Sequence, residues 1–187
     1  MVLLDRTEKS LTLAFFSTGR PHNALQTQCI NTLVAYLGNN GIKAETLGRS
    51  LWSVEKPLIP IRKKMSLSHG AVIVAMERFC SRSGIYKRGS EDRKVTGRQY
   101  FPSVWVQVEG AMAYQLGLPL LILKDKRLVS EGIVDSSIHE WIVIEFDHRK
   151  PSQLLETPRR DYIYSWINLV RSHRLRNAKR GDKGNKS

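Results

Sequence analysis

Short apolar runs that alternate with segments of helical periodicity constrain the fold of this chain more than any other feature. The clearest run is Gly70–Met76, which contains no polar side chain. Continuous apolar runs of this length, bounded by turn residues, are typical of strands that are buried on both faces of a parallel sheet. Four further segments are predicted to be strands: Leu11–Phe16, Ile42–Leu47, Leu120–Leu123 and Trp141–Phe146.

Between these runs the apolar residues recur with helical spacing, which predicts helices there. Asn23 and Ser103 are suited to cap the helices after the first and third strands, because their side-chain oxygens accept hydrogen bonds from free N–H groups. The first of these helices should end at the turn residues 39–41. The other expected helices are Ile59–Ser68, Ser103–Leu116 and Arg159–Arg176, and the segments Gly48–Pro60 and Glu77–Pro102 are expected to be irregular, the second as a long polar loop.

The order of these elements predicts an α/β fold. We expect a single doubly wound, flavodoxin-like sheet of five parallel strands in the order 2-1-3-4-5, with helices on both faces. Lys43 and Glu45 indicate that the second strand lies at an edge. We expect the domain to span residues 1–177 and a basic, flexible tail to follow at 178–187. Such sheets bind ligands at the carboxyl ends of their strands, here beside the first and third.

Positive charge is concentrated in two segments. The chain has 30 Lys and Arg against 17 Asp and Glu, which gives a net charge of +13, and residues 158–187 and 77–100 carry most of the excess. This pattern indicates a surface that attracts a nucleic acid, a polyphosphate or an acidic partner. The alternative is a solubilising tail and a solvated loop. Because the sequence has no nucleic-acid-binding motif, we expect nucleic acid to bind only through a non-specific basic surface.

The sequence predicts neither a membrane anchor nor a metal site. No apolar run approaches the roughly 20 residues that span a bilayer, and charged residues come too early at the N-terminus for a signal peptide. The five histidines and the two cysteines, Cys29 and Cys80, lack the spacing of metal ligands. We therefore expect a cytoplasmic protein with free thiols and no bound metal.

Two segments at the expected strand ends are suited to bind an anion. The first, 16–21, combines small residues with the start of a helix, so that Ser17 and Arg20 could hold phosphate or hydroxyl groups. It matches neither a Walker loop nor a dinucleotide fingerprint, and a plain turn is the alternative. The second segment carries Arg78, which could contact a phosphate or instead pair with Glu77 or Glu91.

Glu109 is the most informative single residue. It is the only carboxylate in an otherwise apolar helical segment, and burial of an unpaired carboxylate costs several kcal/mol. Trp105 lies one turn earlier on the same face, and Gly110 would let a ligand or a neighbouring backbone approach closely. A functional carboxylate is the favoured interpretation. The alternative is a salt bridge with Arg98 or Arg20 that holds a loop in place.

The segment Ser103-Val104-Trp105-Val106-Gln107-Val108-Glu109 resembles the signature of the TIR (Toll/interleukin-1 receptor) domain family. The order of the apolar runs from Leu11 to Arg176 is also similar to that of the family. In its enzymatic members the matching Glu cleaves the bond between nicotinamide and ribose in NAD. The resemblance therefore implies that Glu109 is catalytic, with Ser103 and Trp105 in the same motif.

A second, partial similarity concerns Glu109–Pro119. The nucleoside 2-deoxyribosyltransferases carry a nucleophilic Glu followed by Gly, Ala and a Gly-x-Pro, but here Gly110 comes one position early and their Asp-rich segment is missing. Both families place one Glu beside the anomeric carbon of a ribose and break a C–N bond through an oxocarbenium-like transition state. The nicotinamide of NAD is cationic and leaves without a general acid, so a lone Glu fits NAD better than a neutral nucleoside.

These resemblances imply an N-glycosidase that hydrolyses or cyclises NAD in bacterial antiviral or cell-death signalling. NAD would be its substrate, and no cofactor is expected. On this interpretation Phe16 lines the pocket, Ser17 and Arg20 hold ribose or phosphate, Trp105 stacks on the base, and Arg78 contacts the pyrophosphate. One alternative is a non-catalytic sensor of a nucleotide second messenger, and a second is a deoxyribosyltransferase-like enzyme. A homo-oligomer or filament is compatible with any of these functions.

Overall fold

A five-stranded, all-parallel sheet forms the centre of the domain. The computed structural model describes residues 11–46, 58–137 and 141–184. The strands lie in the order β2 (Ile42–Glu45), β1 (Thr12–Thr18), β3 (Gly70–Ala75), β8 (Leu120–Asp125) and β9 (Ile142–Phe146). This is the predicted 2-1-3-4-5 order when only the strands of this sheet are counted. The doubly wound α/β fold is therefore confirmed, with β2 at an edge as its charged residues indicated.

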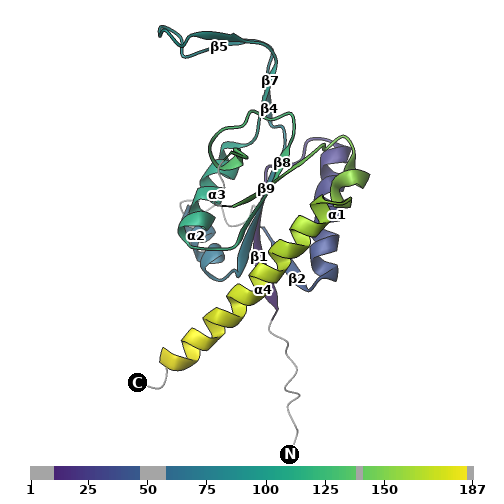
Figure 1. Ribbon diagram of the computed structural model, residues 1–187, viewed down its shortest axis with the longest axis vertical. Helices are drawn as coiled ribbons and strands as arrows, with labels where there is room; N and C mark the ends of the chain where they lie inside the picture. Colours follow the sequence, from purple (N-terminus) through teal and green to yellow (C-terminus); the bar gives the residue numbers. More distant parts are fainter. Residues whose placement is uncertain (1–10, 47–57, 138–140, 185–187) are drawn as a thin grey trace, which may run out of the picture.

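Helices cover both faces of this sheet (Figure 1). They are α1 (Ala24–Asn39), α2 (Leu58–Ser66), α3 (Val104–Gln115) and α4 (Arg159–Gly184), with short 3-10 helices η2 (Gly132–Val134) and η3 (Pro151–Leu155). Helices α1 and α4 pack on one face, and α2 and α3 on the other. Both predicted caps are present: Asn23 accepts a hydrogen bond from the backbone N–H of Gln26, and Ser103 accepts one from that of Trp105.

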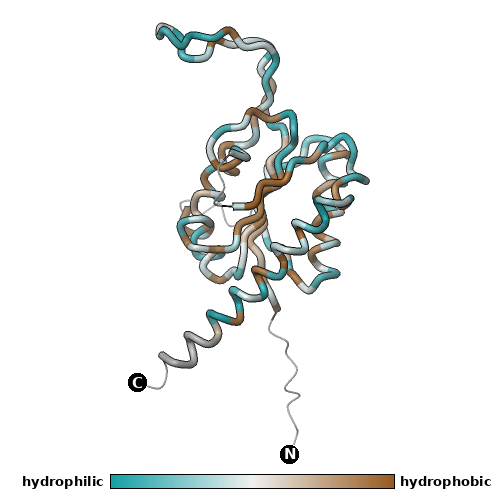
Figure 2. The backbone as a smooth tube through the Cα atoms, viewed as in Figure 1, coloured by the Kyte–Doolittle hydropathy of each residue, from teal (hydrophilic) through white to brown (hydrophobic). Residues whose placement is uncertain are grey.

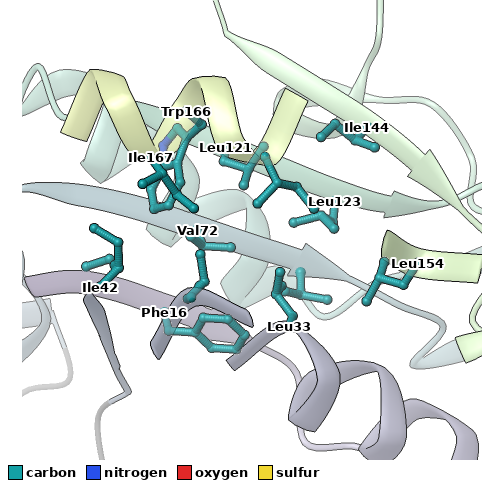
Figure 3. Packing of buried hydrophobic residues seen from close by; sticks show 14 of the residues in the cluster. Phe16, Leu33, Ile42, Val72, Leu121, Leu123, Ile144, Leu154, Trp166 and Ile167 are labelled. Carbon is teal, nitrogen blue, oxygen red and sulfur yellow. The ribbon is translucent and has the colours of Figure 1, made fainter. Parts of the chain in front are cut away.

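Alternate residues of the central strands supply the two halves of the core. Phe16, Val72 and Leu121 belong to the cluster on the side of α1 and α4, which also contains the fully buried Trp166 (Figure 3). Their neighbours in sequence point to the opposite cluster beneath α2 and α3. Each central strand is thus buried on both faces, which explains its continuous apolar sequence. The indole N–H of Trp166 donates to the carbonyl of Pro119 at 3.0 Å, so this large side chain is buried without an unsatisfied donor.

The segment between β3 and α3 is not the long loop that we expected. It folds into two successive antiparallel strand pairs, β4 (Phe79–Ser81) with β7 (Gln99–Phe101) and β5 (Gly84–Tyr86) with β6 (Lys94–Thr96). We call residues 79–101 the arm. Figure 1 shows that it projects away from the sheet and helices. Its outer strands, β5 and β6, have no buried face, so their sequence lacks the apolar alternation by which a strand is recognised.

Several element boundaries also differ from the expected ones. Helix α4 continues past Arg176 to Gly184, through much of the segment that we expected to be a flexible tail. The residues of this extension are mainly polar and add nothing to the apolar periodicity of the helix. The end of that periodicity therefore predicted a helix that was too short. Strand β1 extends to Thr18, and α2 begins at Leu58 and ends at Ser66. The irregular segment expected around Trp52, and the end of the second strand at Leu47, lie outside the described residues.

Two further observations concern the described ranges as a whole. None of their helices is both long enough and apolar enough to cross a bilayer. Cys29 is buried and Cys80 is exposed on the arm, and both are free thiols.

Candidate active site

A cleft of about 250 Å³ opens at the carboxyl ends of β1 and β3, beside the start of α3. This is the switch point of the sheet, where the chain connections leave β1 in opposite directions and where α/β proteins of this type bind ligands. All seven residues that the sequence indicated as site residues line this one cleft. They are Phe16, Ser17, Arg20, Arg78, Ser103, Trp105 and Glu109.

Glu109 lies half-buried in the wall of this cleft, and Ser17 is its hydrogen-bond partner. The Ser17 hydroxyl at the end of β1 donates to Glu109 Oε2. Burial raises the pKa of the Glu109 carboxyl above its ordinary value, and the hydrogen bond from Ser17 opposes this shift. Within the described residues no cation pairs with Glu109, so the expected alternative, a salt bridge to Arg98 or Arg20, is not formed. The carboxylate therefore faces the cleft without a compensating charge.

Ser103 and Trp105 position the start of α3. The Ser103 hydroxyl accepts the backbone N–H of Trp105 at 3.4 Å, and so helps to fix the first turn of the helix whose next turn carries Glu109. Trp105 is half-buried, lines the cleft and packs against the core cluster beneath α3. One helical turn separates it from Glu109, which places an aromatic ring and a carboxylate on the same side of the helix.

Two arginines give the mouth of the cleft a positive charge. Arg20 and Arg78 are both exposed, and neither forms an ion pair with another described residue. The expected alternative for Arg78, a pair with Glu77 or Glu91, is not formed, and Glu77 binds Arg127 at 2.9 Å. Both arginines also line an adjoining cleft at the start of α1, together with His22 and Asn23. An anionic group that entered from this side would meet two unneutralised cations.

Four other residues of the cleft were not singled out from the sequence: Phe15, Thr18, Gly19 and Thr46. Thr18 and Gly19 belong to the turn that was recognised, but nothing in their residue types distinguished them. Thr46 directly follows β2, so the predicted strand order alone could have placed it at this edge. Phe16 also lines the cleft, but only 2% of this residue is exposed. Its low exposure follows from its place in the core cluster beneath α1.

Gly110 serves packing and does not open space for a ligand. A Cβ atom at this position would lie 2.7 Å from Cγ1 of Ile133 in η2. The close approach that the glycine indicated is therefore real, but the partner is a buried side chain of the same chain. The space next to Glu109 along the helix is already filled.

We expect the change Gly110→Ala to destabilise the fold by about 1–3 kcal/mol, because Ile133 and η2 would have to move. Gly38→Ala in α1 is the matched control, since a Cβ there would meet nothing within 4 Å. It should stabilise the protein by about 0.5–1 kcal/mol through helix propensity. Urea unfolding followed by circular dichroism measures both. Equal stability of Gly110→Ala and wild type would contradict this packing role.

A second polar cluster lies outside the cleft, and sequence reasoning missed it. Asp125 at the end of β8 is fully buried and contacts both Arg127 and the Nδ1 atom of His148. Arg127 also binds Glu77 and stacks on Tyr100 of the arm, with 4.7 Å between the guanidinium carbon and the ring centre. Apart from Asp125 and Arg127, which are two residues apart, these residues are distant in sequence, so local spacing could not have revealed the cluster. The cluster joins the ends of three strands to the base of the arm.

The fold and the cleft together define a doubly wound α/β domain with one half-buried carboxylate and two free cations at its switch point. No family model matches the chain, and a search of curated proteins found no match. Among the described residues, no three His, Cys, Asp or Glu side chains are grouped as a metal site requires. The resemblance to TIR domains remains a prediction.

Proposed function

We propose that the protein is a nucleotide N-glycosidase that cleaves the bond between nicotinamide and ribose in NAD. The observation that carries this proposal is the Glu109 carboxylate, which is half-buried, hydrogen-bonded by Ser17 and unpaired with any described cation. A carboxylate so placed stabilises positive charge that develops on a bound ligand more strongly than one in water does. The anomeric carbon of a ribose develops such a charge as its C–N bond breaks.

The reaction needs no acid beside Glu109. When the bond between the anomeric carbon and the nicotinamide nitrogen breaks, its electron pair goes to the nitrogen and neutralises the cationic ring. The leaving group is then stable without a proton. Glu109 stabilises the oxocarbenium-like ribose until water attacks it and loses a proton to solvent, which gives ADP-ribose. Attack by a nucleophile within the substrate would give a cyclic product instead.

Arg20 and Arg78 support a phosphorylated substrate over a neutral nucleoside. Both are exposed and unpaired with other described residues at the mouth of the cleft. A pyrophosphate there would form charge-assisted hydrogen bonds, which a free nucleoside could not. This favours NAD over the substrates of a deoxyribosyltransferase-like enzyme. Arginines and an aromatic ring would equally suit a non-catalytic nucleotide sensor, which is the second candidate.

The direct test is to incubate the purified protein with NAD and to follow nicotinamide by chromatography. Release of nicotinamide with formation of linear or cyclic ADP-ribose would support the enzyme. Binding of NAD by calorimetry without release would favour the sensor. Transfer of deoxyribose between added bases, without action on NAD, would favour the deoxyribosyltransferase-like alternative. A cytoplasmic enzyme of this type, alone or as a homo-oligomer or filament, fits the role in bacterial antiviral or cell-death signalling that the TIR resemblance implies.

The double change Arg20→Gln/Arg78→Gln is expected to raise KM for NAD about tenfold or more and to change kcat little. Loss of one or two charge-assisted hydrogen bonds to phosphate accounts for an effect of this size. Nicotinamide riboside, which has no phosphate, should be cleaved equally by the variant and the wild type. The control variant Lys150→Gln/Arg160→Gln removes the same charge elsewhere on the surface. Its KM and kcat for both substrates should equal those of wild type. An equal loss with both substrates would contradict a phosphate-binding role.

A further inference from the structure

The arm is the largest feature of the molecule that the proposed function does not use. Figure 1 shows the β5–β6 pair well away from the central sheet, and the outer part of the arm is mainly hydrophilic with a few apolar positions (Figure 2). Ile85 and Val95 are paired across the two strands and share one face, and Tyr86 and Lys94 share the other. All four are exposed. The outer part of the arm, β5 and β6, therefore presents two exposed faces to solvent.

The arm carries a strong, largely uncompensated positive charge. It has six Lys and Arg residues against two acids, Glu91 and Asp92. The structure gives one ion pair within it, Lys87 with Asp92. The other cations form no ion pair with a described residue: Arg82, Arg88, Arg93, Lys94 and Arg98. Such a row of exposed, unpaired cations on a projecting ribbon is suited to an extended polyanion.

Other occupants fit these observations less well. A second copy of the chain would bring another net charge of +13 toward the arm, and like charges oppose that contact. Small anions bind in concave sites, and none of the clefts described above is lined by arm residues. An anionic membrane would also attract the arm, but the apolar face formed by Ile85 and Val95 is small for insertion. A two-stranded ribbon, in contrast, has the width that the DNA major groove admits.

We propose that the arm binds double-stranded DNA without sequence specificity. The unpaired cations of the arm contact the phosphates on either side of a groove. One of the two exposed faces of the β5–β6 pair, that of Tyr86 or that of Ile85 and Val95, lies toward the groove. Residues 87–93 connect the two strands at the tip, where the left-handed backbone at Lys87 and Gly89 helps to reverse the chain direction. This inference is independent of the proposed cleavage of NAD.

The test uses a fluorescein-labelled 20-base-pair duplex of mixed sequence and measures its anisotropy with the full chain between 50 and 200 mM KCl. About four phosphate contacts predict a fall in affinity of about a hundredfold over this range. The arm variant combines Arg82→Gln, Arg88→Gln, Arg93→Gln and Lys94→Gln. It should bind at least about tenfold more weakly at 100 mM salt and depend much less on salt.

The matched control variant removes four exposed cations from helices α2 and α4 and from the loop before η3: Arg62→Gln, Lys63→Gln, Lys150→Gln and Arg176→Gln. It should bind within about threefold of wild type, because it keeps the arm contacts. Thermal unfolding checks that both variants fold. An equal loss in the two variants, or no binding by wild type at 50 mM salt, would overturn the proposal. So would arm-dependent binding to phosphatidylserine vesicles without binding to the duplex.

Discussion

The change Glu109→Gln is expected to reduce the release of nicotinamide from NAD by at least about a thousandfold. Glutamine has nearly the same volume and can still accept the hydrogen bond from Ser17. It carries no charge, however, and so cannot stabilise the positive charge on the ribose in the transition state. Because the ground-state contacts are kept, the loss should appear in kcat rather than in KM. Initial rates over a range of NAD concentrations measure both.

The same substitution should not destabilise the fold. Burial raises the pKa of Glu109 in the folded state above its unfolded value, so ionisation of this group works against folding as the pH rises through these values. Removal of the charge should therefore leave the Tm at pH 7 equal to or above that of wild type. Loss of activity together with unchanged stability would separate catalysis from packing. Equal nicotinamide release by both proteins would refute Glu109 as the catalytic residue.

The pH dependence of wild-type activity provides a second readout of the same residue. The proposed mechanism requires the ionised carboxylate, so kcat/KM should rise with pH, with a midpoint above the ordinary pKa of a glutamate. Ser17→Ala removes the hydrogen bond that lowers this pKa, so the midpoint should move to higher pH. A midpoint that stays in place or moves to lower pH would show that another group controls the rate.

The sheet and the cleft could be predicted because their signals are local. Strands buried on both faces need continuous apolar runs, as Gly70–Met76 shows, and the strand order then brings the segments after β1 and β3 together. Glu109 stood out because a single charge within an apolar helix is costly. For these reasons the residues expected at the strand ends do line a single cleft.

The features that were missed depend on contacts between distant parts of the chain. The outer strands of the arm, β5 and β6, pair with each other and are exposed, so burial does not shape their sequence. Gly110 was expected to admit a ligand or a backbone, but its neighbour is the side chain of Ile133, in a segment whose position no periodicity predicted. Likewise, Asp125, Arg127 and His148 have ordinary neighbours in sequence, and only the folded chain shows that they meet.

The change Arg127→Met is expected to destabilise the protein by about 3 kcal/mol. Asp125 is fully buried, and Arg127 forms two of its side-chain contacts. Removal of one partner leaves a buried carboxylate without its full compensation, which costs more than the intact pair contributes. The expected loss of about 3 kcal/mol is at the low end of the range for breaking a buried ion pair. This is because 20% of the Arg127 side chain is exposed and His148 still contacts Asp125. Urea unfolding at pH 7 measures the change.

Arg149→Met is the matched control, because Arg149 pairs with Asp147 two residues earlier in the chain, as Arg127 pairs with Asp125. The Arg149 side chain is 52% exposed, so water replaces much of the lost interaction, and the effect should be far smaller. Addition of Asp125→Asn to Arg127→Met should restore part of the loss, because the unpaired charge is then gone. Equal effects of the two arginine changes would mean that burial of Asp125 does not set the cost. Since Arg127 also binds Glu77 and stacks on Tyr100, its loss should further loosen the position of Arg78 at the mouth of the cleft.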